Sequence, residues 1–271
     1  MIQAIFFDLD GTLLDGKKRI PPSARQAILA AREKGVSFYF ATARSPRLGE
    51  TLGWQGADFA LFDGGVYSNG GCTEIRGEKE FTFIDPQAVI HCLQEVKKYP
   101  GVHLSLHMPG DGYAFNFPVT KDMEAGWGLE NARICTIDEA DLHSIAKILI
   151  FYDHLTDSVD VLPAGLWDDL SRLCAPLAHI YLTDQGRTIQ ATGRDAGKKN
   201  AIERIRQQMG WGLDQVAVFG DDINDLEMIS FYPNGIAMGN GDPAVKRAAT
   251  FVTGDHESDG IAQGIAWLMR E

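Results

Sequence analysis

The chain has 271 residues, of which 45% are hydrophobic and 23% charged, enough for one large domain or two smaller ones with adequate cores. Its formal net charge of −12, with no run of Lys and Arg, argues against binding to a nucleic acid backbone. No stretch approaches the 18 consecutive apolar residues of a membrane span, so we expect no membrane partner. A small anionic substrate remains compatible if a local site supplies positive charge.

The four cysteines, at positions 72, 92, 135 and 174, show no Cys-x-x-Cys spacing. We expect all four to be buried or half-buried thiols, as is usual in a reducing compartment. The N-terminus has no basic region followed by a long apolar stretch. Together these features predict a cytoplasmic protein with no obligate protein partner implied.

The N-terminal stretch predicts a strand, a helix and a second strand. The apolar run Ala4–Phe7 is typical of a buried parallel strand, and Asp8 and Asp10 follow at its C-terminal end. Residues 21–23 (Pro-Pro-Ser) predict a helix start, and residues 36–41 predict the next strand. A strand, helix and strand in this order indicate a parallel sheet with a right-handed crossover.

The pattern changes further along the chain. We predict a third strand at Phe59–Phe62 and a hairpin over Val66–Ile75 that turns at Asn69-Gly70. Strands and helices then alternate loosely, which predicts an α+β module with an antiparallel sheet, inserted into the first domain. Its expected elements are helices at 86–98 and 162–173 and strands at 102–108, 114–117, 145–152 and 179–182.

The α/β rhythm resumes near residue 197 and continues to the C-terminus. The expected elements are helices at 197–209, after 225, at 243–249 and at 260–269, and strands at 216–219, around 236 and at 251–252. Because both ends of the chain share one rhythm, we predict one core formed by residues 1–82 and 186–271, with residues 83–185 inserted.

Polar side chains follow three of the predicted strands. They are Asp8, Asp10, Thr42, Asp221, Asp222, Asn224 and Asp225, and Lys198 lies at the start of a predicted helix. The carboxyl ends of parallel strands share one edge of a sheet, where open α/β sheets bind ligands. Clustered carboxylates repel and raise one another's pKa, so such a cluster usually holds a hard cation, and its oxygen-only ligands favour Mg²⁺. For a bare Asp-x-Asp, a solvated acidic loop is the alternative.

Such a site suits phosphoryl transfer. A carboxylate such as Asp8 can attack phosphorus and form an aspartyl-phosphate. Two like charges 4 Å apart at an effective dielectric of 20 repel by about 4 kcal/mol, roughly a thousandfold in rate. Mg²⁺ and Lys198 would offset this repulsion. Asp10, with a pKa that we expect crowding to raise, would serve as the acid and base, and Thr12 and Thr42 could donate to phosphate oxygens.

The motifs together resemble a known family. DLDGT at 8–12, Thr42 at a strand end, Lys198 before a helix and GDDIND at 220–225 are similar to the haloacid dehalogenase superfamily of phosphatases. Their order and spacing resemble the Cof-type branch, subfamily IIB, over nearly the whole chain. The resemblance implies an α/β fold, a Rossmann-like parallel-sheet core with an inserted α+β cap domain.

The resemblance also implies roles around a Mg²⁺ ion. Asp8 would be the nucleophile and a metal ligand, and Asp10 the acid and base, bound to the metal through its backbone carbonyl. Asp221 would complete the protein ligands. Asp225 would support these ligands without contacting the metal.

Other positions are implied to contact the substrate. Thr42 and Lys198 would hold the phosphoryl group with help from Thr12, and Asn224 would lie near phosphate or substrate. Arg44 could reach the substrate or bind the cap, although an Arg after a strand is about as often a surface ion pair.

Three positions depart from the family pattern. The chain has Thr-Ala-Arg at 42–44 where Thr-Gly-Arg is typical, Asp63-Gly64 in place of Asn-Gly, and Lys198-Lys199 in place of Lys-Gly. No catalytic group is lost. Asp63 and Lys199 could alter the charge near the mouth of the pocket, so the substrate preference stays open.

Several residues of the inserted module admit two interpretations. His103 and His107, with Ser105 between them, would share one strand face and could contact the leaving group, although a histidine on a strand more often has a structural role. Trp127 and Trp167 could line the cap, but we expect them in its core.

The sequence predicts a Mg²⁺-dependent phosphatase that acts on a small phosphorylated metabolite, with sugar phosphates as one class. A phosphomutase would use the same nucleophile and acid/base and stays open. A phosphoacceptor switch would also use a metal-bound Asp and a Lys, but such domains are far shorter. A dehalogenase would need neither Asp10 nor Asp221, which disfavours that activity.

Overall fold

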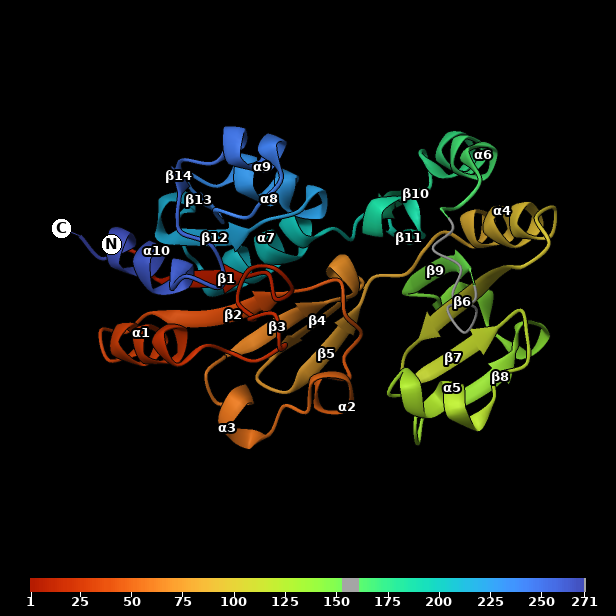
Figure 1. Cartoon of the computed structure of the whole chain (residues 1–271), viewed down its shortest axis with the longest axis horizontal. Coiled ribbons are helices and arrows are strands. Elements are labelled where there is room, and N and C mark those ends of the chain that lie inside the picture. The colour runs from red at the N-terminus through yellow and green to blue at the C-terminus, as the bar shows by residue number, and fades with distance from the viewer. Residues whose placement is uncertain (153–160, 271) are drawn as a thin grey trace. The chain divides into compact units, whose positions relative to one another are not determined.

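The structure is a computed structural model that describes residues 1–152 and 161–270. The chain divides into two compact units. The first comprises Met1–Glu80 and Lys198–Glu271, and the second comprises Phe81–Gly197. Figure 1 labels the elements of both. Across the described residues, no helix combines the length and the hydropathy needed to cross a membrane.

An eight-stranded sheet forms the centre of the first unit, in the order β14-β13-β12-β1-β2-β3-β4-β5. Strands β14 to β3 in this order are parallel, and β4 pairs antiparallel with β3. The strands are β1 (Ala4–Phe7), β2 (Ser37–Ala41), β3 (Gly64–Tyr67), β4 (Cys72–Ile75), β5 (Glu78–Phe81), β12 (Val216–Gly220), β13 (Asn234–Ala237) and β14 (Phe251–Val252). This parallel-rich α/β architecture confirms the predicted fold class.

The longer helices of this unit each bury an apolar stripe. The helices are α1 (Pro22–Arg32), α2 (Leu48–Leu52), α3 (Gly56–Phe59), α7 (Lys198–Met209), α8 (Leu226–Phe231), α9 (Pro243–Ala248) and α10 (Gly260–Leu268). Ala201, Ile202 and Ile205 recur at helical spacing in α7 and join one buried cluster with Phe6 and Val218 of the sheet. The helix α7 is thereby fixed against the strands that carry the candidate site.

The second unit contains a six-stranded sheet in the order β10-β11-β9-β6-β7-β8, antiparallel except for the parallel pair β7 and β8. Its strands are β6 (Val102–Met108), β7 (Gly112–Phe115), β8 (Arg133–Thr136), β9 (Lys147–Tyr152), β10 (Ala178–Thr183) and β11 (Thr188–Gly193). Its helices are α4 (Pro86–Val96), α5 (Lys121–Gly126) and α6 (Ala164–Cys174). The largest apolar cluster of this unit joins α4 and α6 to one face of the sheet.

The structure corrects the predicted third strand at Phe59–Phe62. Gly56–Phe59 is the short helix α3, and the third strand is β3, which begins at Gly64. The apolar run has another cause. The Phe62 ring stacks on Trp54 with 5.5 Å between the ring centroids, and it forms a T-shaped pair with Phe40 with 5.3 Å between the centroids. Phe62 and Trp54 thus form an aromatic cluster with Phe40 of β2. In a single sequence, the periodicity of a short apolar run does not distinguish such a cluster from a strand.

The second unit extends further than the segment 83–185 expected from the sequence. Strand β11 pairs with β10 on one side and with β9 on the other, so residues 188–193 belong to the six-stranded sheet. The unit runs from Phe81 to Gly197. Both Trp127 and Trp167 pack against apolar clusters of this unit, as expected.

The four cysteines are free thiols, three of them buried and Cys135 half-buried, as expected. The sequence did not indicate that two of them meet. The Cys92 and Cys174 sulfur atoms lie 3.9 Å apart between α4 and α6.

Candidate active site

The carboxyl edge of the eight-stranded sheet brings distant segments of the chain together. Asp8 follows β1, Thr42 follows β2 and Asp221 follows β12, and these three strands are parallel neighbours. The predicted convergence of strand ends is therefore present. Lys198 arrives from α7, whose first residue it is, after Gly197 with a φ of +94°.

One buried ammonium group joins two carboxylates. The Lys198 Nζ donates to Asp8 Oδ1 at 2.5 Å and to Asp225 Oδ1 at 2.6 Å. Lys198 is 2% exposed, Asp8 6% and Asp225 0%. Burial alone would lower the pKa of Lys198, but the charges of Asp225 and Asp8 raise it above its ordinary value. Lys198 is thus a cation held within hydrogen-bond distance of the predicted nucleophile.

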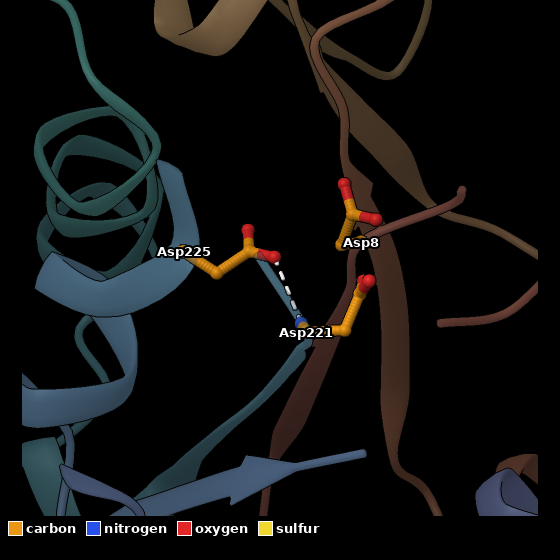
Figure 2. Close-up of side chains that lie close together, drawn as sticks. All are labelled: Asp8, Asp221 and Asp225. Atoms are coloured by element: carbon orange, nitrogen blue, oxygen red, sulfur yellow. Dashed lines mark hydrogen bonds between the residues drawn. The ribbon is translucent and has the colours of Figure 1, made fainter. Parts of the chain in front are cut away.

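Asp221 lies beside this pair and is positioned by two neighbours. Its Oδ1 accepts from the Thr12 hydroxyl at 2.6 Å, and its backbone N–H donates to Asp225 Oδ2 at 3.0 Å. Figure 2 shows this second bond and the three aspartates converging from two segments of the chain. Gly11 has a φ of +81°, and a Cβ there would collide with the Asp221 carboxylate, so glycine is required at this position.

The arrangement fits a hard divalent cation. Asp8, Asp221 and Asp225 each offer a carboxylate oxygen, and these oxygens lie within 4.8 Å of one another. Burial raises the pKa of Asp8, an effect opposed by Lys198 and reinforced by Asp225 and Asp221. Burial and the Asp225 charge likewise raise the pKa of Asp221 to about 7. A cation among these oxygens would relieve the crowding.

Asp225 supports the other acids through fixed donors. Its Oδ2 accepts from the backbone N–H groups of Asp221 and Asp222 at 3.0 and 3.2 Å, while its Oδ1 binds Lys198. These bonds hold the Asp221 loop against α7. The family resemblance implies that Asp225 supports the metal ligands without contacting the metal, and an Asp225 oxygen lies within the possible cation cluster.

Asp10 differs from the sequence prediction in its ionisation. Arg44 binds its carboxylate in a bidentate manner, with Nε to Oδ2 at 2.6 Å and Nη2 to Oδ1 at 2.8 Å, and Lys18 Nζ lies 2.6 Å from Oδ1. Burial would raise the pKa of Asp10, but these cations lower it below its ordinary value. The predicted upward shift is wrong for Asp10, because the crowding acts on Asp8 and Asp221.

The remaining predicted groups lie on the same edge. Thr42 is 1% exposed, and its Oγ1 accepts from the backbone N–H of Arg44 at 3.1 Å, which leaves the hydroxyl proton to be donated elsewhere. Asn224 Nδ2 donates to Asn69 Oδ1 at 3.1 Å, joining the β3–β4 turn to the Asp221 loop. Thr12, predicted to bind phosphate, donates instead to Asp221.

Sequence reasoning missed Lys18 and Asn69 as parts of this edge. Lys18 belongs to an ordinary basic stretch, and only the fold brings it to Asp10. Asn69 was recognised as a turn residue, and its φ of +50° is one that Asn tolerates. An Asn-Gly turn gives no signal for a partner 155 positions away.

Two of the three departures from the family pattern contact groups other than the aspartates of the candidate site. Asp63 precedes β3 at the opposite edge of the sheet, where it accepts from Arg32 at 2.8 and 3.0 Å and from the Phe38 backbone N–H at 2.9 Å. The Lys199 Nζ lies 3.5 Å from Glu227 and 5.1 Å from the centre of the Phe231 ring. The suggestion that Asp63 alters the charge near a pocket mouth is therefore wrong.

Comparisons with known proteins agree with this geometry. A family model described as haloacid dehalogenase-like hydrolase matches residues 5–265. The chain is 27% identical over 275 residues to the pyridoxal phosphate phosphatase YbhA of Escherichia coli K12, covering 97% of both chains. It is 25% identical over 271 residues to a phosphoglycolate phosphatase of Methanothermobacter thermautotrophicus, covering 99% of both.

Solved structures show the same fold. The subclass IIB sugar phosphatase BT4131 superposes with a TM-score of 0.79 at 23% identity, with 98% of both chains covered. A haloacid dehalogenase-like hydrolase from Bacteroides thetaiotaomicron gives a TM-score of 0.76, also at 23% identity, over 99% of this chain and 100% of that one.

The protein belongs to the haloacid dehalogenase-like hydrolase family. The resemblance read from the motifs is thereby confirmed. The chain is a phosphoric monoester hydrolase, the activity that the names of the two relatives described above state.

Proposed function

We propose that the protein is a Mg²⁺-dependent phosphatase that hydrolyses a small phosphorylated metabolite through an aspartyl-phosphate at Asp8. The main support is the buried Lys198 ammonium, which lies 2.5 Å from Asp8 with Asp221 beside the pair. A positive charge at this point offsets the repulsion between the carboxylate and an anionic substrate.

In the first step a carboxylate oxygen of Asp8 attacks phosphorus, and the bond from phosphorus to the leaving oxygen breaks. Asp10 gives a proton to the leaving oxygen. In the second step water attacks phosphorus, Asp10 takes the proton from that water, and phosphate leaves to restore Asp8. Thr42 donates its hydroxyl proton to a phosphoryl oxygen, and Lys198 neutralises charge throughout. As the structure stands, Asp10 is an anion suited to accept a proton, so donation requires its contacts with Arg44 and Lys18 to open.

A divalent cation would be held by Asp8 and Asp221, together with the backbone carbonyl of Asp10. When bound, Mg²⁺ supplies charge stabilisation of the phosphoryl oxygens. The raised pKa of Asp221 and the close oxygens of the three aspartates support this assignment. The oxygen-only ligand set favours Mg²⁺ over zinc.

The names of the relatives support a small substrate. They include phosphatases for pyridoxal phosphate and phosphoglycolate. We include sugar phosphates in the proposed class because a subclass IIB sugar phosphatase shares the fold. The four free thiols support the cytoplasm as the proposed location.

The proposal is tested by phosphate release from 4-nitrophenyl phosphate with Mg²⁺ or with EDTA. We expect continuous release in Mg²⁺, little in EDTA, and loss of release in Asp8→Asn. Asp63→Asn, the same substitution at the opposite edge of the sheet, serves as the matched control. Release of 4-nitrophenol that stops near one equivalent, with the phosphoryl group retained on the protein, would indicate a phosphoacceptor switch, and unchanged phosphate release from Asp8→Asn would refute the role of Asp8.

A further inference from the structure

Two hairpin turns of the chain have the same backbone conformation. The turn between β3 and β4 comprises Ser68–Gly70, and the turn between β10 and β11 comprises Asp184–Gly186 (Figure 1). The φ angles are +52°, +50° and +93° in the first turn and +53°, +55° and +87° in the second. Only the third residue of each turn is glycine, so each turn holds two side chains in the left-handed region.

The two turns differ in burial. Asp184 and Gln185 are exposed, as is usual for residues of a surface turn. Ser68 is 3% exposed and Asn69 is 1% exposed. Residues in a sparsely populated backbone region persist where surrounding contacts hold them, and they cluster at functional sites. The contacts of the buried turn therefore indicate what it supports.

The backbone of the buried turn holds the segment that follows β2. The Ser68 N–H donates to the Arg44 carbonyl at 2.8 Å. The Asn69 N–H donates to the Thr42 carbonyl at 3.0 Å. In the proposed mechanism the Thr42 hydroxyl donates to a phosphoryl oxygen. The turn thus supports Thr42 through backbone bonds, which depend on the conformation of the turn and not on its side chains.

The Asn69 side chain makes a different connection. Its Oδ1 accepts from Asn224 Nδ2 at 3.1 Å, although the two residues are 155 positions apart. Asn224 is half-buried and lies in the loop after β12 that also carries Asp221 and Asp225. An Asn side chain has two N–H donors, so a bond from one of them to Asn69 is compatible with a bond from the other to a ligand oxygen.

Holding the Asn224 amide in advance has a physical benefit. A side chain without a fixed partner samples several rotamers, and ordering it when the substrate binds costs free energy. A donor that is already in place avoids this cost and meets the phosphoryl oxygen in the reactive geometry.

We propose that Asn69 is a positioning residue that holds the Asn224 amide for a bond to a phosphoryl oxygen. The choice of a phosphoryl group as the ligand rests on the proposed phosphatase function. The inference adds to that function a residue that acts through Asn224 and does not contact the substrate.

The first experiment removes the Asn69 side chain and keeps the turn. Asn69→Gly does this, because glycine adopts a φ of +50° without strain. We expect kcat/KM for 4-nitrophenyl phosphate to fall about tenfold, as for a donor displaced from its working position. The Mg²⁺ concentration for half-maximal activity should stay within twofold of the wild type, because Asn224 is not among the proposed metal ligands. Gln185→Gly, the matched change in the exposed turn, should leave kcat/KM within twofold of the wild type.

A double-mutant cycle tests whether Asn69 acts through Asn224. In the Asn224→Ala background, Asn69→Gly should change kcat/KM by no more than twofold. A tenfold loss in both backgrounds, or no loss in either, would overturn the proposal. Thermal melting checks that the variants are folded. If Asn69→Gly does not fold, Asn69→Ser replaces it in the cycle, because serine lacks the amide oxygen and already occupies the left-handed region at position 68.

A second measurement needs no turnover. Inorganic phosphate is titrated into the Mg²⁺-loaded protein, and its affinity is measured by calorimetry. We expect Asn69→Gly to weaken phosphate binding about tenfold and Gln185→Gly to leave it unchanged. If no ester is hydrolysed but Asn69→Gly weakens phosphate binding, the proposed function fails while the positioning role stands. If esters are hydrolysed and Asn69→Gly changes neither phosphate affinity nor kcat/KM, the positioning role alone is refuted.

Discussion

The two edges of the eight-stranded sheet use similar charges in opposite ways. At the carboxyl edge, one buried ammonium, Lys198, serves both Asp8 and Asp225, and Asp221 lies beside them. At the amino edge, Asp63 pairs with Arg32, each about a third exposed. Asp63 and Arg32 thus form a one-to-one pair that is partly exposed. Lys198 is instead shared by two buried carboxylates, with Asp221 close by, which suits this group to a cation and a phosphoryl group.

The contrast between the two edges is tested most strongly by removing Lys198, the ammonium group that Asp8 and Asp225 share. Lys198→Met should lower kcat/KM by about a thousandfold, because about 4 kcal/mol of charge repulsion is no longer offset. Two buried carboxylates would also lose their partner, so the Mg²⁺-free protein should lose about 3–5 kcal/mol of unfolding free energy. Steady-state kinetics and urea unfolding measure the two effects.

Lys199→Met is the matched control for that variant. The neighbouring Lys199 points to Glu227 and Phe231, so its removal should change kcat/KM by no more than a few-fold. Equal losses in the two variants would mean that the carboxyl edge does not depend on Lys198 in particular.

The next largest effect is expected for Thr12, whose hydroxyl orients the Asp221 carboxylate. Thr12→Val removes the hydroxyl that donates to Asp221 Oδ1 at 2.6 Å. We expect the Mg²⁺ concentration for half-maximal activity to rise about tenfold or more, with kcat at saturating Mg²⁺ largely retained, because Thr12 orients a metal ligand. A fall in kcat with an unchanged Mg²⁺ requirement would show instead that Thr12 binds the phosphoryl group.

The excess of carboxylates also predicts that the stability of the protein, and its stabilisation by Mg²⁺, depend on pH. The pKa of Asp221 is about 7 in the folded protein and about 3.9 in an unfolded chain, so its contribution to Mg²⁺-free stability is present below about pH 4 and is lost as the pH rises through about 7. Protons and Mg²⁺ compete for the same oxygens. Saturating Mg²⁺ should therefore raise Tm by about 3 °C or more at pH 8 and by much less at pH 5. Equal shifts at both pH values would contradict this account.

The smallest effect is expected at the amino edge. Asp63→Asn should cost about 1 kcal/mol of unfolding free energy, because the Arg32 pair is partly exposed, and should leave kcat/KM within twofold of the wild type. Thermal melting and kinetics with 4-nitrophenyl phosphate measure both. A large loss of activity would show that the two edges are coupled.

Much of the carboxyl edge could be predicted from the sequence. Asp8, Thr42 and Asp221 each follow a short apolar run, and parallel strands bring their ends together whatever the details of packing. The ionisation of Asp10 could not be predicted, because Arg44 and Lys18 reach it only through the folded loops. The hydrogen-bond partner of Thr12 could not be predicted either, because its hydroxyl could donate to a phosphate oxygen or to Asp221.

The inserted unit was less predictable for a different reason. Strand β11 carries the alternating Thr188, Gln190 and Thr192, a pattern too polar to stand out in a single sequence. In this sheet Lys147 lies opposite His107 of β6 and opposite Thr192 of β11, and only the register of the three strands makes them neighbours. Register depends on the whole sheet, so these neighbours could not be identified from their spacing.

The central claim is that Asp8 takes up the phosphoryl group. The most direct test is to quench the enzyme in acid during turnover of 4-nitrophenyl phosphate, reduce it with borohydride and identify the reduced residue by peptide mass spectrometry. The account predicts conversion of Asp8 to homoserine, dependent on both substrate and Mg²⁺. Steady turnover with Asp8 unreduced, or with reduction at Asp10 instead, would contradict it.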